Sequence, residues 1–419
     1  MESNASFLRG TDSNQIQKTG SSTNMPSLQS KNSPEYLELL EKIYVICKDI
    51  IGPNADDVDK QARFPVESFN AIKELKLLSA YLPKELGGMG LGIHQISKIC
   101  EVLGHYCGST AMIYSMHQIQ VACILHHYKG SEYFKNYLIK LSNEQRLIAS
   151  ATTEIGIGGD LRSSLCAVEI DGNTIKLEKK APVISYGLQA DDLILTARKN
   201  SDAPKSDQVQ VLLHKGDYEL EPISGWDTLG LRGTCSSGFI VKGSGSKEQV
   251  LPTPFADILS QSMHPFAHIT WASLWSGIAS NAVNKARKVI KRQALNNVDA
   301  PPISAIRLGE VDAILQLMRS NIAKQEDEYA QMLIEDDENA FTNFGFGIRT
   351  NNLKMSSANL IVEIVGKAMM ICGIASYRND SPISLGRQLR DAYGAALMVN
   401  NDRIMLHNST LLLMHKEDH

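Results

Sequence analysis

The sequence predicts an α+β protein with an N-terminal helical domain, a central β-barrel-like or sandwich domain and a C-terminal four-helix bundle. Apolar residues recur at helical spacing before residue 147 and again after residue 254. Between them, residues 147–254 combine short apolar runs with frequent turn signals, such as Asp171-Gly172-Asn173. Helical stretches on both sides of one β segment favour separate helical and sheet layers.

The composition is typical of a globular protein with a large core. The 419 residues are 43% hydrophobic and 21% charged, and the net charge is −4. This charge gives no electrostatic reason to expect a nucleic acid or an anionic membrane as partner. No apolar run approaches the ~20 residues of a membrane span. Seven scattered cysteines without metal-ligand spacing, and no signal-peptide pattern, predict a cytoplasmic protein with no metal site.

The N-terminal part divides into a tail and a helical domain. Residues 1–33 are rich in Ser, Asn, Gln and Thr, which predicts a disordered tail with no function of its own. The helical domain is expected at residues 34–146. Ser33 followed by Pro34 has the residue types that start a helix. Further helical patterns follow at residues 66–78, 93–103, 109–127 and 131–139, with a glycine-rich turn at 87–92.

The remaining chain is expected to form a β domain at residues 147–254 and a helical bundle at residues 255–419. Pro252-Thr253-Pro254 closes the β domain. Long apolar patterns with helical spacing then predict helices at about 256–294, 303–335, 351–372 and 388–415. The acidic run at residues 335–338 is interpreted as a solvated helix end.

A glycine-rich loop follows the first predicted strand, Leu147-Ile148-Ala149-Ser150. Residues 151–160 read A-T-T-E-I-G-I-G-G-D, with three glycines in four positions. Glycine lets backbone N–H groups approach a ligand closely, and threonine hydroxyls can bond to ring heteroatoms or phosphate oxygens. The pattern is not G-x-G-x-x-G and no helix follows it, so a dinucleotide fold is not indicated. On these residues alone, a structural turn is at least as well supported as a ligand site.

Four segments together carry a family resemblance. The loop at residues 153–160 resembles the T-E-P-G-x-G-S-D segment of the acyl-CoA dehydrogenase superfamily, which includes flavin-dependent monooxygenases. Residues 82–91 resemble its P-x-E-x-G-G-x-G-L turn, and residues 225–234 its G-W-D-x-x-G-x-R-x-S/T segment. Leu389-Arg390-Asp391-Ala392 resembles the R-D-A before its last helix. The segments agree in order and spacing over roughly residue 35 to the C-terminus.

The resemblance implies FAD bound between the β domain and the bundle, usually across a subunit interface. FMN stays possible, because the adenosine side of the pattern is incomplete here. The positions that match family contacts to the cofactor are Thr152, Thr153, Gly158, Gly159, Val183, Ser185, Arg292 and Gly373.

Several of these positions depart from the family pattern. Val183 replaces a tryptophan and loses its stacking face, while Ser185 keeps the hydroxyl expected near flavin N5. The Phe-Gly that follows the family arginine is absent after Arg292, so Arg292 is equally well interpreted as a surface residue that binds no cofactor. Residues 369–373 keep only the second glycine of Q-x-x-G-G. Without the resemblance, residues 181–187 would be interpreted as a strand with no ligand.

Neither family position for a catalytic base holds a carboxylate. The usual glutamate aligns with Val399-Asn400, and the alternative position on the first bundle helix falls within residues 264–268. The candidates are therefore Asp402 and His268, each with a structural alternative. His117 lies on an apolar helical stripe and is interpreted first as a core residue. It stays a candidate because a histidine near this point can face the flavin in monooxygenase relatives.

Three functions remain open from the sequence. The leading one is FAD-dependent α,β-dehydrogenation of an acyl thioester, carried by CoA or by a carrier protein, with an atypical base. The second is a flavin-dependent monooxygenase supplied with reduced flavin by a partner reductase. The third is a flavin-binding or acyl-CoA-binding protein without catalysis. The resemblance also implies a homodimer or homotetramer, and leaves the electron acceptor open.

Overall fold

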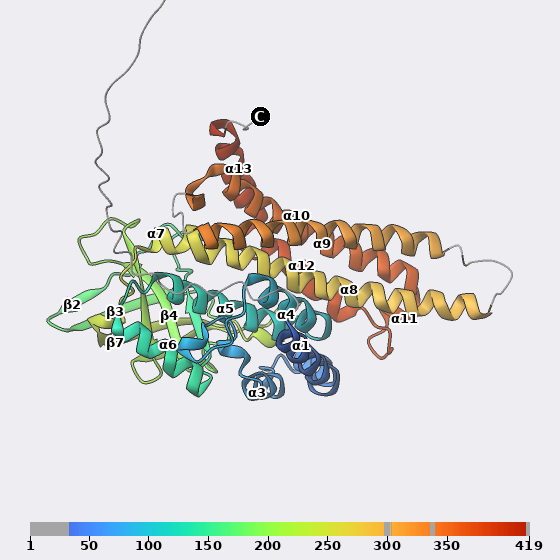
Figure 1. Ribbon diagram of the computed structural model, residues 1–419, viewed down its shortest axis with the longest axis horizontal. Helices are drawn as coiled ribbons and strands as arrows, with labels where there is room; N and C mark the ends of the chain where they lie inside the picture. Colours follow the sequence, from blue (N-terminus) through green and yellow to red (C-terminus); the bar gives the residue numbers. More distant parts are fainter. Residues whose placement is uncertain (1–32, 297–301, 303, 336–339, 416–419) are drawn as a thin grey trace, which may run out of the picture.

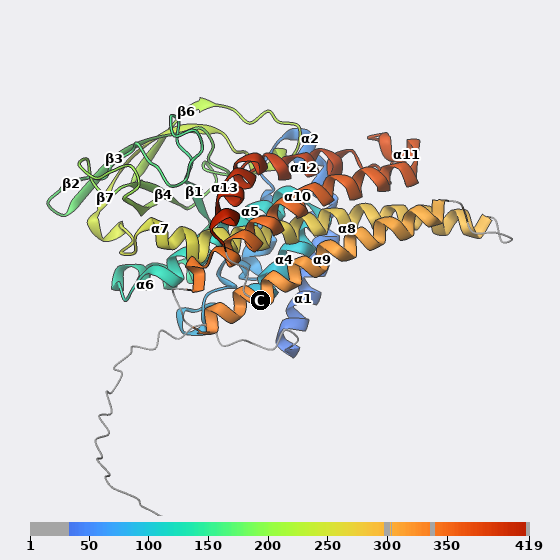
Figure 2. The same cartoon turned by 90° about the horizontal axis from the view of Figure 1, so that it is seen from above.

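The computed structural model describes residues 33–296, 302, 304–335 and 340–415 (Figures 1 and 2). The predicted tail at residues 1–33 lies almost wholly outside the described residues, as does most of the acidic run at 335–338. Helices occupy the N-terminal part, strands the middle and long helices the C-terminal part. The predicted fold class is confirmed, whereas the division into domains at residues 146 and 254 stays a prediction.

The first six α-helices form the N-terminal part. Helix α1 begins as the sequence predicts, because Ser33 Oγ accepts a hydrogen bond of 3.3 Å from the Tyr36 N–H. A π-helical segment, Cys47–Ile51, joins α1 to α2. The six helices are α1 (Pro34–Ile46), α2 (Gly52–Gln61), α3 (Val66–Glu74), α4 (Ile93–Tyr106), α5 (Gly108–His127) and α6 (Glu132–Glu144).

In the described part of the chain, seven strands form two sheets that do not close into a barrel. The first sheet has the order β1-β4-β5, with β1 parallel to β4, and the second has the order β2-β3-β7-β6, all antiparallel. Strand β3 alternates strictly between exposed and buried residues, which is typical of a strand with one face on a core. The strands are β1 (Ile148–Ala151), β2 (Glu169–Asp171), β3 (Thr174–Ala181), β4 (Asp192–Arg198), β5 (Gln208–His214), β6 (Tyr218–Ser224) and β7 (Gly238–Ser246).

The C-terminal part is built on three long helices, α8, α9 and α10, that extend away from the sheets (Figures 1 and 2). Shorter helices flank them. The elements are α7 (Phe255–Ile258), α8 (His264–Asn296), α9 (Ser304–Glu335), α10 (Phe344–Cys372), α11 (Ile374–Tyr377), α12 (Gly386–Leu397) and α13 (Asn401–Met414).

The last predicted helix, at about 388–415, is wrong as a single element. It is divided into α12 and α13 by a turn at residues 398–400. Val399 and Asn400 both adopt positive φ, at 54° and 38°, which ends a right-handed helix. The Asn400 side chain then caps α13 by accepting a hydrogen bond of 2.9 Å from the Asp402 N–H. Helical periodicity does not reveal this turn, because apolar residues continue through it.

Helix α10 is long and apolar enough to cross a membrane by length and composition, and it is the one such helix in the described part of the chain. In the structure it packs against α8, α9 and α12, and 44% of its most apolar window is buried. The core helix of a bundle passes the same test. This helix is therefore weak evidence for a membrane span.

Two glycines allow α4 and α8 to cross at close range. A Cβ atom on Gly104 would lie 2.3 Å from the Leu274 carbonyl oxygen, and one on Gly277 would lie 2.0 Å from that of Glu101. Both distances are far shorter than a van der Waals contact. The atoms that would clash belong to the helix backbone, which cannot move freely. The N-terminal helices are thus joined to the bundle through a glycine-dependent helix crossing.

We expect Gly104→Ala to lower the free energy of unfolding by ~1–3 kcal/mol, since the added methyl overpacks the helix crossing. Gly309→Ala on α9 is the matched control, because nothing lies within 4 Å of the Cβ that it would add. It should raise stability by about 1 kcal/mol through helix propensity. Urea denaturation of both variants measures the difference, and equal stabilities would contradict the close crossing.

Candidate functional site

The glycine loop is shaped by the side chain of Glu154. Its carboxylate accepts hydrogen bonds from Ser164 Oγ at 2.8 Å, from the Leu165 N–H at 3.0 Å and from the Cys166 N–H at 2.7 Å. These bonds join the start of the loop to its end. Glu154 therefore fixes the shape of the loop.

A buried lysine lies beneath the loop. Lys179 Nζ is 3.5 Å from Glu154 Oε2 and donates to the Thr196 carbonyl at 2.7 Å. Burial lowers the pKa of Lys179 from its usual value, and the nearby Glu154 carboxylate partly offsets this effect. Both side chains are almost fully excluded from solvent, with 0% and 5% exposed. The loop therefore rests on a buried ion pair.

All three glycines of the loop have backbone conformations that favour glycine. Gly156, Gly158 and Gly159 have φ values of 97°, 63° and 78°. No heavy atom lies within 4 Å of the position a Cβ would take at Gly158. The backbone at this point is thus open to a close-fitting ligand.

The structure places the second predicted flavin segment beside this loop. Thr153 Oγ1 donates a hydrogen bond of 3.4 Å to the Val183 carbonyl. Ser185 Oγ lies 2.8 Å from Ser236 Oγ, and Val183 is 39% exposed. The Tyr186 hydroxyl donates to the Ile148 carbonyl in β1 at 2.9 Å, which fixes the segment against the strand before the loop. The start of the glycine loop, at Thr153, is thereby brought together with Val183 and Ser185.

Helix α13 meets the loop through an arginine that the resemblance did not assign to the cofactor. Arg403, in the first turn of α13, donates to the carbonyl of Gly159 at 2.6 Å and to that of Gly158. Just after the loop, Arg162 Nη2 lies 3.1 Å from His407 Nε2 on α13. Arg403 directly follows Asp402 in sequence, and the structure directs its guanidinium to the loop. Its distance from the loop in sequence left no local signal for this contact.

Arg292 and Gly373 lie far from the glycine loop within one chain. Arg292 is in the last turns of α8, and Gly373 ends α10 directly before α11. Figure 2 shows α11 and this end of α8 opposite the strands. One chain therefore does not bring these two residues together with the other six predicted cofactor residues.

The structure gives His117 a place in the core. Its Nδ1 accepts a hydrogen bond of 3.1 Å from the Ile148 N–H, and its Nε2 lies 2.7 Å from the Leu78 carbonyl. The ring is fully buried, and burial lowers its pKa to about 4. Both nitrogens are occupied by backbone groups, so the ring connects α5, β1 and residues 77–79. This agrees with the core interpretation that the sequence favoured.

His268 and Asp402 have contrasting surroundings. His268 Nδ1 lies 3.2 Å from the Thr350 carbonyl, and its ring contacts that of His264 at a centroid distance of 4.2 Å. Burial lowers the pKa of His268 well below its usual value. Asp402 is exposed in the first turn of α13, directly after the turn at 398–400. Both candidates thus belong to the bundle near α13.

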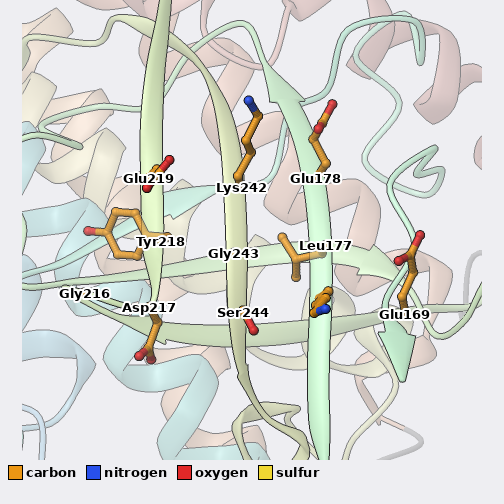
Figure 3. Close-up of a pocket in the computed structure, with 11 residues that line it drawn as sticks. Glu169, Leu177, Glu178, Gly216, Asp217, Tyr218, Glu219, Lys242, Gly243 and Ser244 are labelled. Atoms are coloured by element: carbon orange, nitrogen blue, oxygen red, sulfur yellow. The ribbon is translucent and has the colours of Figure 1, made fainter. Parts of the chain in front are cut away.

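A surface depression on the β2-β3-β7-β6 sheet does not coincide with these residues. It has a volume of about 510 Å³, and Figure 3 shows Lys242 between Glu178 and Glu219 on its floor. Lys242 also pairs with Glu221 at 3.0 Å. None of the predicted cofactor or catalytic residues lines it. The candidate site is therefore the glycine loop with its neighbours.

Comparisons with known proteins test the family resemblance. Residues 33–145 match the family described as "Acyl-CoA dehydrogenase, N-terminal domain". The short-chain specific acyl-CoA dehydrogenase of Clostridium acetobutylicum is 21% identical over 82% of this chain and 88% of that enzyme. The predicted resemblance to the acyl-CoA dehydrogenase superfamily is confirmed.

Two solved structures show the same fold. Butyryl-CoA dehydrogenase from Megasphaera elsdenii superposes with a TM-score of 0.78 at 17% identity, covering 91% of this chain and 99% of that enzyme. The FMN-bound dibenzothiophene monooxygenase TdsC from Paenibacillus sp. A11-2 also gives 0.78, at 16% identity over 91% and 98% of the two chains. Dehydrogenases and monooxygenases thus share this architecture.

We expect Glu154→Gln to destabilise the protein by ~3–5 kcal/mol, because it leaves the Lys179 ammonium buried without its counter-charge. The matched control is Glu221→Gln, which removes the exposed pair with Lys242 and should change stability by less than about 1 kcal/mol. Chemical denaturation of the two variants gives the comparison. Similar losses in both would argue against a structural role for the buried pair.

Acid should destabilise the fold through His117. Its pKa is about 4 in the folded protein and about 6.5 when unfolded, so between these values only the unfolded state binds the proton. The free energy of unfolding should therefore fall as pH drops from 6.5 to 4, by about 3 kcal/mol from this residue. His117→Gln should reduce the slope of stability against pH in this window. An unchanged slope would show that His117 titrates normally.

Proposed function

We propose that this chain is an FAD-dependent oxidoreductase that catalyses the α,β-dehydrogenation of an acyl thioester. The observation that carries the proposal is the meeting of the glycine loop with residues 183–185. These segments are separated in sequence, yet Thr153 Oγ1 donates directly to the Val183 carbonyl, two residues before Ser185. The similar enzymes of Clostridium acetobutylicum and Megasphaera elsdenii are acyl-CoA dehydrogenases, which supports this chemistry.

The residues present fit a flavin dinucleotide. The open backbone at Gly158 suits a closely bound phosphate, and the guanidinium group of Arg403, which donates to the Gly158 carbonyl, complements negative charge. The hydroxyls of Thr153 and Ser185 suit the heteroatoms of the flavin ring. Bound FAD would supply the hydride acceptor. FMN is the alternative, because a structural neighbour holds it.

A second copy of the chain completes the proposed site. Arg292 and Gly373 lie at the far end of the bundle from the glycine loop, so they reach a flavin only in a neighbouring subunit. Exposed apolar residues near Gly373 support association: Met370 is 70% exposed, Ile374 76% and Tyr377 74%. We therefore propose a homodimer or homotetramer.

Asp402 is the proposed base. Its carboxylate lies in the first turn of α13 and removes the proton from the substrate carbon next to the thioester carbonyl. His268 is the alternative, but its burial disfavours the protonated imidazolium that proton abstraction would produce. The substrate is a thioester of CoA or of a carrier protein. All seven cysteines are free, which suits a cytoplasmic enzyme.

The monooxygenase is the second candidate. It is favoured by the absence of a carboxylate at Val399, Asn400 and residues 264–268, and by the FMN-bound monooxygenase among the structural neighbours. In that case a partner reductase supplies reduced flavin.

The deciding experiment follows the visible spectrum of the purified protein during anaerobic addition of short-, medium- and long-chain acyl-CoA. Bleaching of the oxidised flavin by one chain class is expected and identifies the substrate. A flavin that binds but never bleaches would contradict the dehydrogenase. Oxygen-dependent hydroxylation after addition of reduced flavin would then support the monooxygenase.

Asp402→Asn should slow bleaching by ~10²–10⁴-fold without loss of bound flavin, since it removes the general base. Glu132→Gln is the matched control, because Glu132 is also an acid in the first turn of a helix but lies on α6. His268→Gln should slow bleaching less than Asp402→Asn does. The opposite ranking would identify His268 as the base.

A further inference from the structure

The turn between α12 and α13 has an unfavourable backbone. Val399 and Asn400 are consecutive non-glycine residues at positive φ, and Val399 is β-branched. Such residues rarely adopt this conformation, and it persists only where the surroundings hold it. The position and direction of α13 depend on this turn.

Lys354 holds both ends of the turn. Its Nζ donates to the carbonyl of Met398, the first residue of the turn, and to Asn401 Oδ1, directly after the turn, at 2.6 Å in the second case. The side chain is fully buried within α10, and its two bonded partners are neutral oxygens. Burying an ammonium without a counter-charge is costly, so a role beyond packing is indicated.

The same part of α10 connects α8 to α13. Asn351 Oδ1 accepts from His264 Nε2 on α8 at 2.8 Å, and Asn351 Nδ2 donates to Asn408 Oδ1 on α13 at 2.6 Å. The network therefore fixes α13 at two points, Asn401 and Asn408. From this position, Arg403 reaches the carbonyl of Gly159.

We infer that Lys354 is a positioning residue: by holding the turn at 398–400 it sets α13, with Asp402 and Arg403, against the glycine loop. The inference rests on the proposed function only in so far as that loop holds the flavin. Loss of the ammonium releases the turn, so that α13 and the loop lose their fixed contact. Lys354 itself does not contact the substrate.

The test compares Lys354→Met with Asn401→Ala by hydrogen–deuterium exchange. Both variants should speed amide exchange in residues 155–163 and 399–407 by about tenfold, the equivalent of one hydrogen bond to a charged group. Exchange in α9 should stay unchanged. Lys285→Met is the matched control: Lys285 is a partly buried lysine on α8 that donates to the Ser384 carbonyl at 2.6 Å. It should leave residues 155–163 unaffected.

Flavin affinity gives a second readout. The dissociation constant of the flavin should rise about tenfold in Lys354→Met and in Asn401→Ala, and the double variant should be no worse than Lys354→Met, because the two residues act through one bond. Additive losses, or unchanged exchange in residues 155–163 in a folded variant, would overturn the inference. If Lys354→Met does not fold, Asn401→Ala decides. If the wild type binds no flavin, the proposed function fails, and the exchange experiment still tests Lys354.

Discussion

The buried pair of Glu154 and Lys179 is the constraint on which the candidate site depends. A loop with three glycines at positive φ has little conformational preference of its own. Glu154 restricts it by accepting three hydrogen bonds from residues 164–166, and Lys179 anchors that carboxylate to β3 and β4. The loop can therefore be both open to a ligand and fixed in place.

Helix α13 provides the second boundary of the site. It is short, and it is held by polar contacts more than by apolar packing: Arg403 to the loop, and Asn401 and Asn408 to α10. Its outer face is largely apolar and exposed, with Leu413 89% exposed. A few polar groups therefore set the position of α13, and its exposed apolar face is a surface that can contact another molecule.

The two halves of the proposed cofactor site lie at opposite ends of one chain. Thr153, Val183 and Ser185 are near the glycine loop, whereas Arg292 and Gly373 are beside α11. This separation is the geometric reason for proposing a homodimer or homotetramer, in which each copy would carry one half of the proposed contacts. The length of α8 produces the separation, because its 33 residues place Arg292 far from the sheets.

The sequence by itself determined the fold class, the long helices and the residues of the glycine loop, because periodicity and turn chemistry are local and four motifs occur in register. Only the tertiary structure decided the break between α12 and α13, the backbone partners of His117 and the roles of Arg403 and Lys354. Each of these depends on contacts between residues far apart in the chain. Lys354 on α10 donates a hydrogen bond to Asn401 on α13. Arg403 donates one to the carbonyl of Gly159, 244 residues away in the sequence. Local spacing carries no information about such pairs, since packing of the whole fold brings them together.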